Sequence, residues 1–345
     1  MAQEQLFQEF QLLTNKDWQL KAEEGLRGQP ITSLQSNWFG LDIEPYYSSE
    51  DILDSTRQAP IRATTTGWIN YVSITVKNEI QANKLARDSL MIGATGLYFN
   101  LIEPANFNIL LEKIDLSACA IAFEGQVNVE AYLLYAEQNT SADKLSGFVG
   151  RPEIYTVPTS KEFYPTVLAP SSENELSALT TILFELHKIL RPIAEDHATP
   201  IIQNIAYKLE MGLNYFFSIA KIRALRILLK KFFSAYSLDF NEADFHIISL
   251  SKYWNKRDYA PHENMLKATT SAMAATIGGC NSLIIESGNS DDQEKLVARN
   301  ISSILEFESF LNKVADPAAG SYFIENLTDN IVNKVWQNFM DGLDS

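Results

Sequence analysis

The sequence has little of what disulfides, metal sites and polyanion binding require. Its 345 residues include 2 cysteines and 4 histidines, and 28 Lys and Arg stand against 43 Asp and Glu, which gives a net charge of −15. The two cysteines, Cys119 and Cys280, provide neither a disulfide framework nor a zinc-ligand spacing, as is typical of a reducing compartment. Nucleic acids and anionic membranes bind clustered basic residues, so the composition argues against both as partners.

Several targeting and catalytic signals are also missing. No apolar run approaches the roughly 18 residues of a membrane span, and the N-terminus lacks the basic and apolar regions of a signal peptide. The chain contains no Walker loop, HExxH motif or nucleophile elbow. We therefore expect a cytoplasmic protein that holds no metal ion.

What the sequence does contain is a regular alternation of strand and helix patterns. Apolar, β-branched runs typical of strands occur at residues 68–76, 96–101, 115–124, 153–157, 164–168, 245–250, 282–286 and 320–325. Helical spacing occurs at residues 79–93, 127–137, 174–190, 200–217, 219–236, 264–277, 293–314 and 327–340. Eight strands over about 250 residues predict an α/β fold of the (β/α)8 TIM-barrel type. An open doubly wound sheet would also fit the alternation, but no GxGxxG motif follows the first strand.

Residues 1–60 differ from the remainder and predict an N-terminal arm, so that the barrel comprises residues 61–345. The arm is rich in aromatic residues and has too little sequence to bury them by itself. Its anchors are Trp18, Trp38, Phe39, Tyr46 and Tyr47. Two arrangements stay open: the arm reaches onto a second subunit, or it folds back on its own barrel.

Three stretches of the chain together resemble methylmalonyl-CoA mutase. Residues 316–328 (DPAAGSYFIENLT) are similar to that family's D-P-W-[AG]-G-S-Y-Y-[IV]-E-x-L-T. Residues 269–282 (TTSAMAATIGGCNS) and 215–226 (YFFSIAKIRALR) are similar to two further family motifs, and their order and spacing agree along the chain. The resemblance implies a TIM barrel preceded by an arm, with coenzyme A along the barrel axis and adenosylcobalamin on a separate C-terminal domain. The sequence ends just after the last barrel helix, so we expect that cobalamin-binding domain to be absent.

The chain departs from the family where the resemblance would place catalytic residues. The family's first barrel strand carries two arginines and a tyrosine, and these positions fall on Thr66, Tyr71 and Ser73. The position of the catalytic histidine falls on Ile193, with His197 four residues later. We therefore expect no catalytic residue and no metal ligand in this chain. The candidates for a remnant of the substrate site are His246, Asn281, Glu325 and His197.

Two local patterns allow a sharper interpretation. Residues 244–249 (DFHIIS) approximate the DxHxxG signature that places a histidine beneath cobalt in B12-dependent mutases, but the glycine is missing and the segment lies in a strand pattern, so we exclude it. His246 faces the barrel interior in that pattern, either as a hydrogen-bonded core histidine or as a ligand. A basic stripe on residues 219–236 predicts a solvated helix face, with a site for the 3′-phosphate of coenzyme A or for an acidic partner as the alternative. The stripe comprises Lys221, Arg223, Arg226, Lys230 and Lys231.

Threading of coenzyme A requires small polar residues along the axis, whereas the strands here carry large apolar ones, as at residues 97–99, 247–248 and 283–285. The resemblance and these departures predict the small (beta) subunit of a heterodimeric methylmalonyl-CoA mutase, silent by itself. Its partner would be the catalytic large (alpha) subunit, which leaves adenosylcobalamin and acyl-CoA to the complex; a homodimer in isolation stays open. The alternatives are an active acyl-CoA mutase barrel that uses a cobalamin domain from another chain, and a chaperone-like barrel that helps the cofactor-bearing chain assemble.

Overall fold

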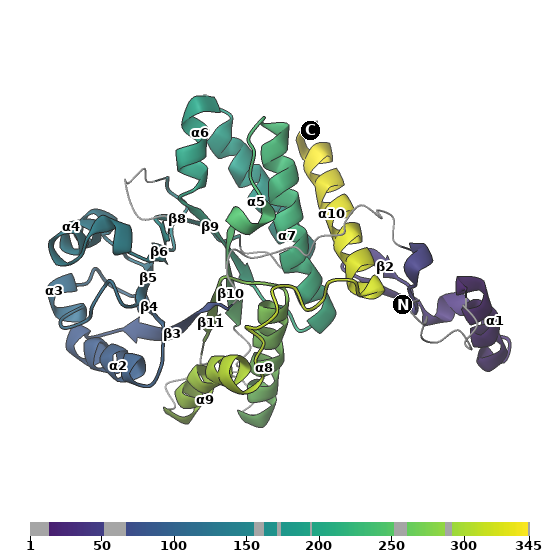
Figure 1. Cartoon of the computed structure of the whole chain (residues 1–345), viewed down its shortest axis with the longest axis horizontal. Coiled ribbons are helices and arrows are strands. Elements are labelled where there is room, and N and C mark those ends of the chain that lie inside the picture. The colour runs from purple at the N-terminus through teal and green to yellow at the C-terminus, as the bar shows by residue number, and fades with distance from the viewer. Residues whose placement is uncertain are drawn as a thin grey trace, which may run out of the picture.

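The computed structural model describes residues 14–51, 67–154, 162–170, 174–193, 195–251, 261–286 and 292–343. Within these residues, nine parallel segments form one sheet in the order β7-β6-β5-β4-β3-β11-β10-β9-β8. Their bounds are β3 Ile69–Val76, β4 Gly96–Leu101, β5 Ala120–Gly125, β6 Gly147–Val149, β7 Phe163–Tyr164, β8 Thr166–Leu168, β9 Ile205–Glu210, β10 His246–Ser251 and β11 Ser282–Ile285. Helices surround this sheet (Figure 1).

The sheet closes on itself at Pro165, which separates β7 from β8. Proline has no N–H to donate, so the ladder is interrupted at that residue. On one side β7 pairs with β6, and on the other β8 pairs with β9. Val167 N–H also donates to Arg151 O, just beyond β6, over 2.8 Å. The nine segments therefore occupy eight positions around a nearly closed ring, and the predicted TIM-barrel fold is confirmed.

Helices α2 to α8 lie between barrel strands along the chain, and α9 and α10 follow β11. Their bounds are α2 Glu79–Met91, α3 Phe107–Leu110, α4 Val129–Asn139, α5 Glu175–Leu190, α6 Glu195–Ile202, α7 Tyr215–Ala235, α8 Pro261–Ile277, α9 Asp292–Ser303 and α10 Tyr322–Leu343. A π-helical turn, Ile304–Glu308, extends α9. Among the described residues, no helix is both long and apolar enough to cross a bilayer.

Three hydrophobic layers hold the barrel together. One packs the outward side chains of β9, β10 and β11 against α5, α7, α8 and α10, and a second packs those of β3, β4 and β5 against α2, α3 and α4. The third lies inside the ring. Strand alternation separates the layers: on β10, Ile247 belongs to the outer layer and Ile248 to the inner one.

The N-terminal segment packs on the barrel through a short hairpin. The hairpin strands, β1 Ser36–Trp38 and β2 Leu41–Ile43, are antiparallel. Trp38 and Tyr47 both contact Phe323 at the start of α10, with ring centroids 6.0 and 5.5 Å apart. This part of the arm therefore folds back on its own barrel. Helix α1, Asn15–Leu26, has no buried residue and projects beyond the hairpin, far from the sheet (Figure 1).

Several expected elements were wrong in detail. The helix expected at residues 200–217 contains strand β9, because Ile201, Ile205 and Leu209 satisfy a four-residue spacing as well as the alternation of a strand. The strand expected at residues 153–157 is not found at Glu153 and Ile154, and residues 155–157 lie outside the described residues; β6, six residues earlier, takes its place in the ring.

Two further boundaries moved. The strand expected at residues 115–124 begins only at Ala120, because the Asp115 carboxylate accepts hydrogen bonds from Ser117 and forms a turn. The strand expected at residues 320–325 is the start of α10: Gly320 has φ +80° in a turn, and Ser321 O accepts a hydrogen bond from Glu325 N–H in the first helical turn.

Candidate functional site

The middle of the barrel axis is filled by aromatic rings. Tyr71 of β3, Tyr98 of β4 and Phe148 of β6 point inward and are at most 2% exposed. The centroid of the Phe148 ring lies 5.4 Å from that of Tyr71 and 5.9 Å from that of Tyr98. Ala122, Ala206, Ile248 and Ile284 complete this layer. Burial raises the pKa of Tyr71 and Tyr98 well above the usual range, so both phenols stay neutral.

A polar cluster lies toward the carboxyl ends of the strands. Lys208 Nζ of β9 pairs with Glu124 Oε2 of β5 over 2.5 Å, across the ring, and the Tyr98 hydroxyl donates to the same oxygen. The Lys208 side chain is 7% exposed, whereas that of Glu124 is 35% exposed. Active sites of TIM barrels occur at this end. Lys208 was not among the sequence candidates because residues 200–217 were expected to be helical, although a lysine amid alternating apolar residues was a usable signal.

His246 faces the interior at the opposite, amino-terminal end of the strands. Its Nε2 lies 2.8 Å from Ser282 Oγ, and its ring stacks on Tyr164 with centroids 4.3 Å apart. Burial first, and then the charge of Arg226, lower the pKa of His246 to about 3. The imidazole is therefore neutral near pH 7, with one ring nitrogen that donates a hydrogen bond and one that accepts.

The remaining sequence candidates lie in different surroundings. Asn281 is buried just before β11, and its Oδ1 accepts from Arg226 (2.6 Å) and from Ile247 N–H (2.9 Å). Glu325 lies in the first turn of α10, where its Oε1 accepts from Arg223 (2.6 Å) and from Gly320 N–H (3.1 Å). The structure brings His246 and Asn281 to one end of the barrel, since both adjoin Ser282, and leaves Glu325 on an outer helix.

The residues expected at the family's catalytic positions lie in different parts of the structure. Ser73 lies half-buried in β3, and Ile193 packs on the outer hydrophobic layer after α5. The backbone of His197 is in α6, but its side chain lies outside the described residues, as does the whole of Thr66.

Three basic residues of α7 correct the expectation of a solvated face. Lys221, Arg223 and Arg226 are at most 2% exposed, because α7 lies between the sheet and α10. Arg226 donates to the carbonyls of Glu242, Phe245 and Gly279 as well as to Asn281. Arg223 pairs with Asp316 and Glu325. The three family-like motifs therefore contact one another through α7.

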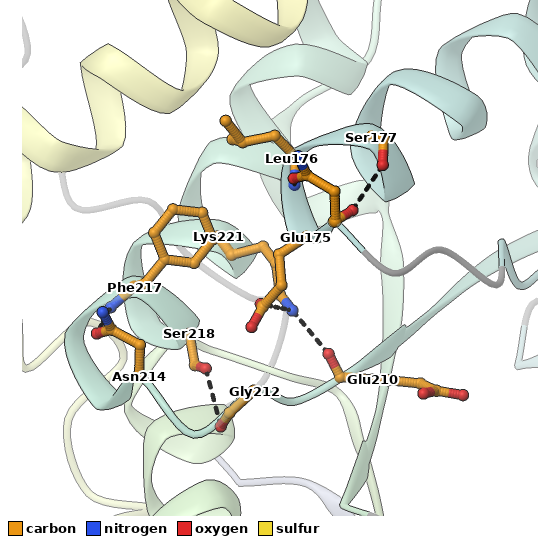
Figure 2. Close-up of polar contacts among 10 residues, drawn as sticks. Glu175, Leu176, Ser177, Glu210, Gly212, Asn214, Phe217, Ser218 and Lys221 are labelled. Carbon is orange, nitrogen blue, oxygen red and sulfur yellow. Dashed lines mark hydrogen bonds and ion pairs between the residues drawn. The ribbon is translucent and has the colours of Figure 1, made fainter. Parts of the chain in front are cut away.

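Figure 2 shows the third buried cation, Lys221, at the start of α7. Its Nζ lies 2.5 Å from Glu175 Oε2, at the first residue of α5, and donates to Glu210 O at the end of β9 over 2.6 Å. Asn214 caps α7 by accepting from Phe217 N–H. Gly212 packs so closely that a Cβ there would lie 1.7 Å from Glu175 Oε1. Lys221 thus fixes α5, β9 and α7 relative to one another.

These surroundings do not fit adenosylcobalamin or coenzyme A. His246 is hydrogen-bonded and stacked inside the ring, so it is not placed to approach a cobalt ion outside the barrel. The aromatic layer occupies the axis that a pantetheine chain would need. Within the described residues, no group of three His, Cys, Asp or Glu side chains is arranged to hold a metal ion.

Comparisons with known proteins agree with the motifs. A family model described as methylmalonyl-CoA mutase matches residues 195–342. The methylmalonyl-CoA mutase small subunit of Porphyromonas gingivalis is 29% identical over an alignment that covers 99% of this chain and 65% of that protein. The methylmalonyl-CoA mutase of Rhizobium meliloti is 22% identical over 94% of this chain and 57% of its own length. The chain thus spans less than two thirds of the length of these two relatives.

Among solved structures, the dihydropteroate synthase of Yersinia pestis aligns with a TM-score of 0.37 and 12% identity over 79% of this chain and 98% of that one. The sequence comparisons confirm the relationship to methylmalonyl-CoA mutase that the three motifs predict. The family model matches the C-terminal part of the chain, and the small subunit aligns along nearly all of it.

Proposed function

We propose that this chain is the barrel part of a methylmalonyl-CoA mutase small subunit, which contributes fold and interface to a heterodimer and no chemistry of its own. The observation that carries the proposal is the aromatic layer of Tyr71, Tyr98 and Phe148 across the axis. A barrel filled in this way offers no path for an extended acyl-CoA. The partner would be the catalytic large subunit, in the cytoplasm, and the complex would interconvert methylmalonyl-CoA and succinyl-CoA.

The charged groups available in the barrel support the same conclusion. Radical rearrangement of an acyl-CoA requires groups that hold the carboxylate and the thioester in place. Lys208, a cation whose side chain reaches across the ring, is already paired with Glu124. The positions of the family's catalytic residues fall on Ser73 and Ile193, which supply no charge. Adenosylcobalamin would therefore act elsewhere in the complex, and acyl-CoA would bind only there.

The candidates for a remnant of the substrate site differ in their hydrogen-bond partners. Asn281 and Glu325 accept hydrogen bonds from buried arginines, which gives each a structural role. His246 faces the axis and is the candidate that a ligand would reach first, if one entered from the amino-terminal end. One observation favours the alternative, an active barrel that uses a cobalamin domain from another chain. The polar cluster of Lys208, Glu124 and Tyr98 lies at the carboxyl ends of the strands, where TIM-barrel enzymes have their active sites.

Calorimetric titration tests the proposal directly. The purified chain is titrated with methylmalonyl-CoA, and the same ligand is titrated into the large subunit of the same organism as a positive control. We expect no specific binding to this chain alone, and turnover only when both chains and adenosylcobalamin are present. Stoichiometric micromolar binding, or turnover by this chain with adenosylcobalamin alone, would overturn the silent-subunit proposal in favour of the active barrel.

A further inference from the structure

Six aromatic rings lie in two groups of contacting rings where the arm contacts the first turns of α7 and α10. This aromatic cluster comprises Trp38, Phe39, Tyr47, Phe216, Phe217 and Phe323. Phe323 is central, with Trp38, Tyr47 and Phe216 at centroid distances of 6.0, 5.5 and 5.4 Å. Phe39 lies 4.6 Å from Phe217.

The described residues of this chain cover the cluster only in part. Phe216 is 48% exposed although it contacts Phe323, and Phe39 is 38% exposed. Two residues close to the cluster in sequence are exposed as well, Leu213 at 59% and Tyr322 at 43%. Single exposed apolar residues are ordinary, but aromatic side chains in mutual contact that stay exposed are typical of interaction sites.

The surroundings of the cluster carry charge of one sign. The three segments that form it, residues 36–51, 210–220 and 317–333, contain no Lys or Arg. They contain seven acidic residues in a chain that has 28 basic residues for 43 acidic ones, and one of the seven, Glu325, forms an ion pair with Arg223. The other six are Asp42, Glu44, Glu50, Asp51, Glu210 and Asp329. An apolar centre with a rim of carboxylates complements a protein surface that has an apolar projection ringed by Lys and Arg.

We propose that this aromatic cluster is the docking surface for the large subunit, and that the large subunit presents basic residues around an apolar projection there. The inference rests on the proposed function, which supplies the partner. A second copy of this chain would bring two acidic rims together, and an anionic membrane would repel the same carboxylates. The charge of the rim therefore selects a basic protein surface.

The surface is also rigid, which reduces the entropy lost on binding. The first turn of α7 is fixed by the Asn214 cap and by Lys221, which bonds to Glu175 and Glu210 (Figure 2). The arm side is fixed by Asn326 Nδ2, which donates to Asp51 O over 3.0 Å. The rings are thus held in place before a partner arrives.

The test measures affinity between the full-length chain and the methylmalonyl-CoA mutase large subunit of the same organism, by calorimetry at two salt concentrations. Phe216→Ser should weaken binding by about 30-fold, the loss typical of an interface hot spot. Leu213→Ser is the second variant, because Leu213 lies in a loop and its loss should leave the fold intact. Phe307→Ser is the matched control, since Phe307 is 63% exposed on the π-helical turn, outside the cluster. It should bind like the wild type.

Charge is tested with Asp42→Lys combined with Glu44→Lys, which should weaken binding and reduce its dependence on salt. If Phe216→Ser and Leu213→Ser both bind like the wild type, or if Phe307→Ser weakens binding as much as they do, the docking surface is overturned while the proposed function stands. If the wild-type chain forms no complex with the large subunit, both are overturned. A homodimer of this chain that the Phe216→Ser variant abolishes would show that a second copy occupies the surface, which also overturns the inference.

Discussion

The barrel axis and helix α7 have opposite relationships to the family that this chain resembles. Along the axis, aromatic and aliphatic side chains fill the space, and Ser73, where the resemblance would place the family's tyrosine, is an uncharged residue of β3. On α7, the family-like motif is kept, and its buried cations bind two other family-like segments, those that contain Asn281 and Glu325. The three family-like motifs are therefore segments that contact one another and stabilise the barrel.

The two regions also differ in how a substitution would act. The axis is stabilised by packing, and the stability that packing contributes decreases gradually as side-chain volume is removed. Helix α7 is held by ion pairs and hydrogen bonds of buried groups, and removal of one partner leaves the other charged and desolvated. The comparison predicts larger single-residue effects on α7 than on the axis.

The largest effect is expected for Arg223→Ala. The guanidinium pairs with Asp316 and Glu325, and the Arg223 and Asp316 side chains are each 2% exposed, so its removal leaves a buried carboxylate without its cation. The free energy of unfolding should fall by about 3–5 kcal/mol, measured by urea denaturation. Lys230→Ala is the control on the same helix: Lys230 pairs with Glu242 but is 42% exposed, and its loss should cost less than about 1 kcal/mol. Equal losses for the two variants would remove the distinction drawn for α7.

The next largest is Phe148→Ala, on the axis. Loss of the ring opens a cavity between Tyr71 and Tyr98 and should lower the free energy of unfolding by about 3–4 kcal/mol. The variant should still not bind methylmalonyl-CoA, because Lys208 and Glu124 remain paired above the cavity. Calorimetric titration of Phe148→Ala with methylmalonyl-CoA checks this, and binding by the variant would mean that a single ring separates this barrel from a substrate channel.

A smaller effect concerns His246, where the axis meets Arg226 of α7. The folded-state pKa of about 3 lies below the ordinary value of 6.5, so the unfolded chain takes up a proton that the folded chain does not. Stability from this group is therefore present above pH 6.5 and is lost as pH falls toward 3. From pH 6.5 to pH 5 the loss should approach about 2 kcal/mol, at 1.4 kcal/mol per pH unit.

The measurement compares urea denaturation of the wild type and of His246→Gln at pH 7 and pH 5. Glutamine can keep a hydrogen bond to Ser282 and does not titrate. The wild type should lose about 2 kcal/mol more than the variant between the two pH values. Parallel losses in both proteins would indicate that His246 is protonated in the folded chain at pH 5.

Much of the fold follows from the sequence pattern because the barrel strands are short, apolar and regularly spaced. The alternation of strands and helices was sufficient for the TIM barrel, even though β9 was assigned to a helix and residues 320–325 to a strand. Those errors arose where one stretch satisfies both periods, as at Ile205 and Leu209, or where a serine and a glycine before a helix resemble a strand end.

The site was harder to predict than the fold. A lysine or arginine on a long helix is usually solvated, so the burial of Lys221, Arg223 and Arg226 could not be inferred before their partners were known. Those partners are 11 to 102 residues away in sequence, and four of them are backbone carbonyls, those of Glu210, Glu242, Phe245 and Gly279. The inward orientation of His246, by contrast, followed from strand alternation alone.

The smallest effect is expected at Gly320, in the segment that Arg223 holds. Its φ of +80° is a conformation that L-residues with a Cβ rarely adopt, yet a Cβ there would meet no atom within 4 Å. Gly320→Ala should therefore lower the free energy of unfolding by about 1–2 kcal/mol through backbone strain alone. The Gly320 N–H that donates to Glu325 Oε1 is retained in the variant. The control is Gly25→Ala in α1, which also has open space around the added Cβ but no positive φ. This variant should be neutral or stabilising by up to about 1 kcal/mol. A thermal or urea unfolding curve for each variant checks the pair. An unchanged midpoint for Gly320→Ala would mean that the loop between Asp316 and Glu325 can relax without disturbing the Arg223 ion pairs, and the segment would then be held by its carboxylates rather than by its turn.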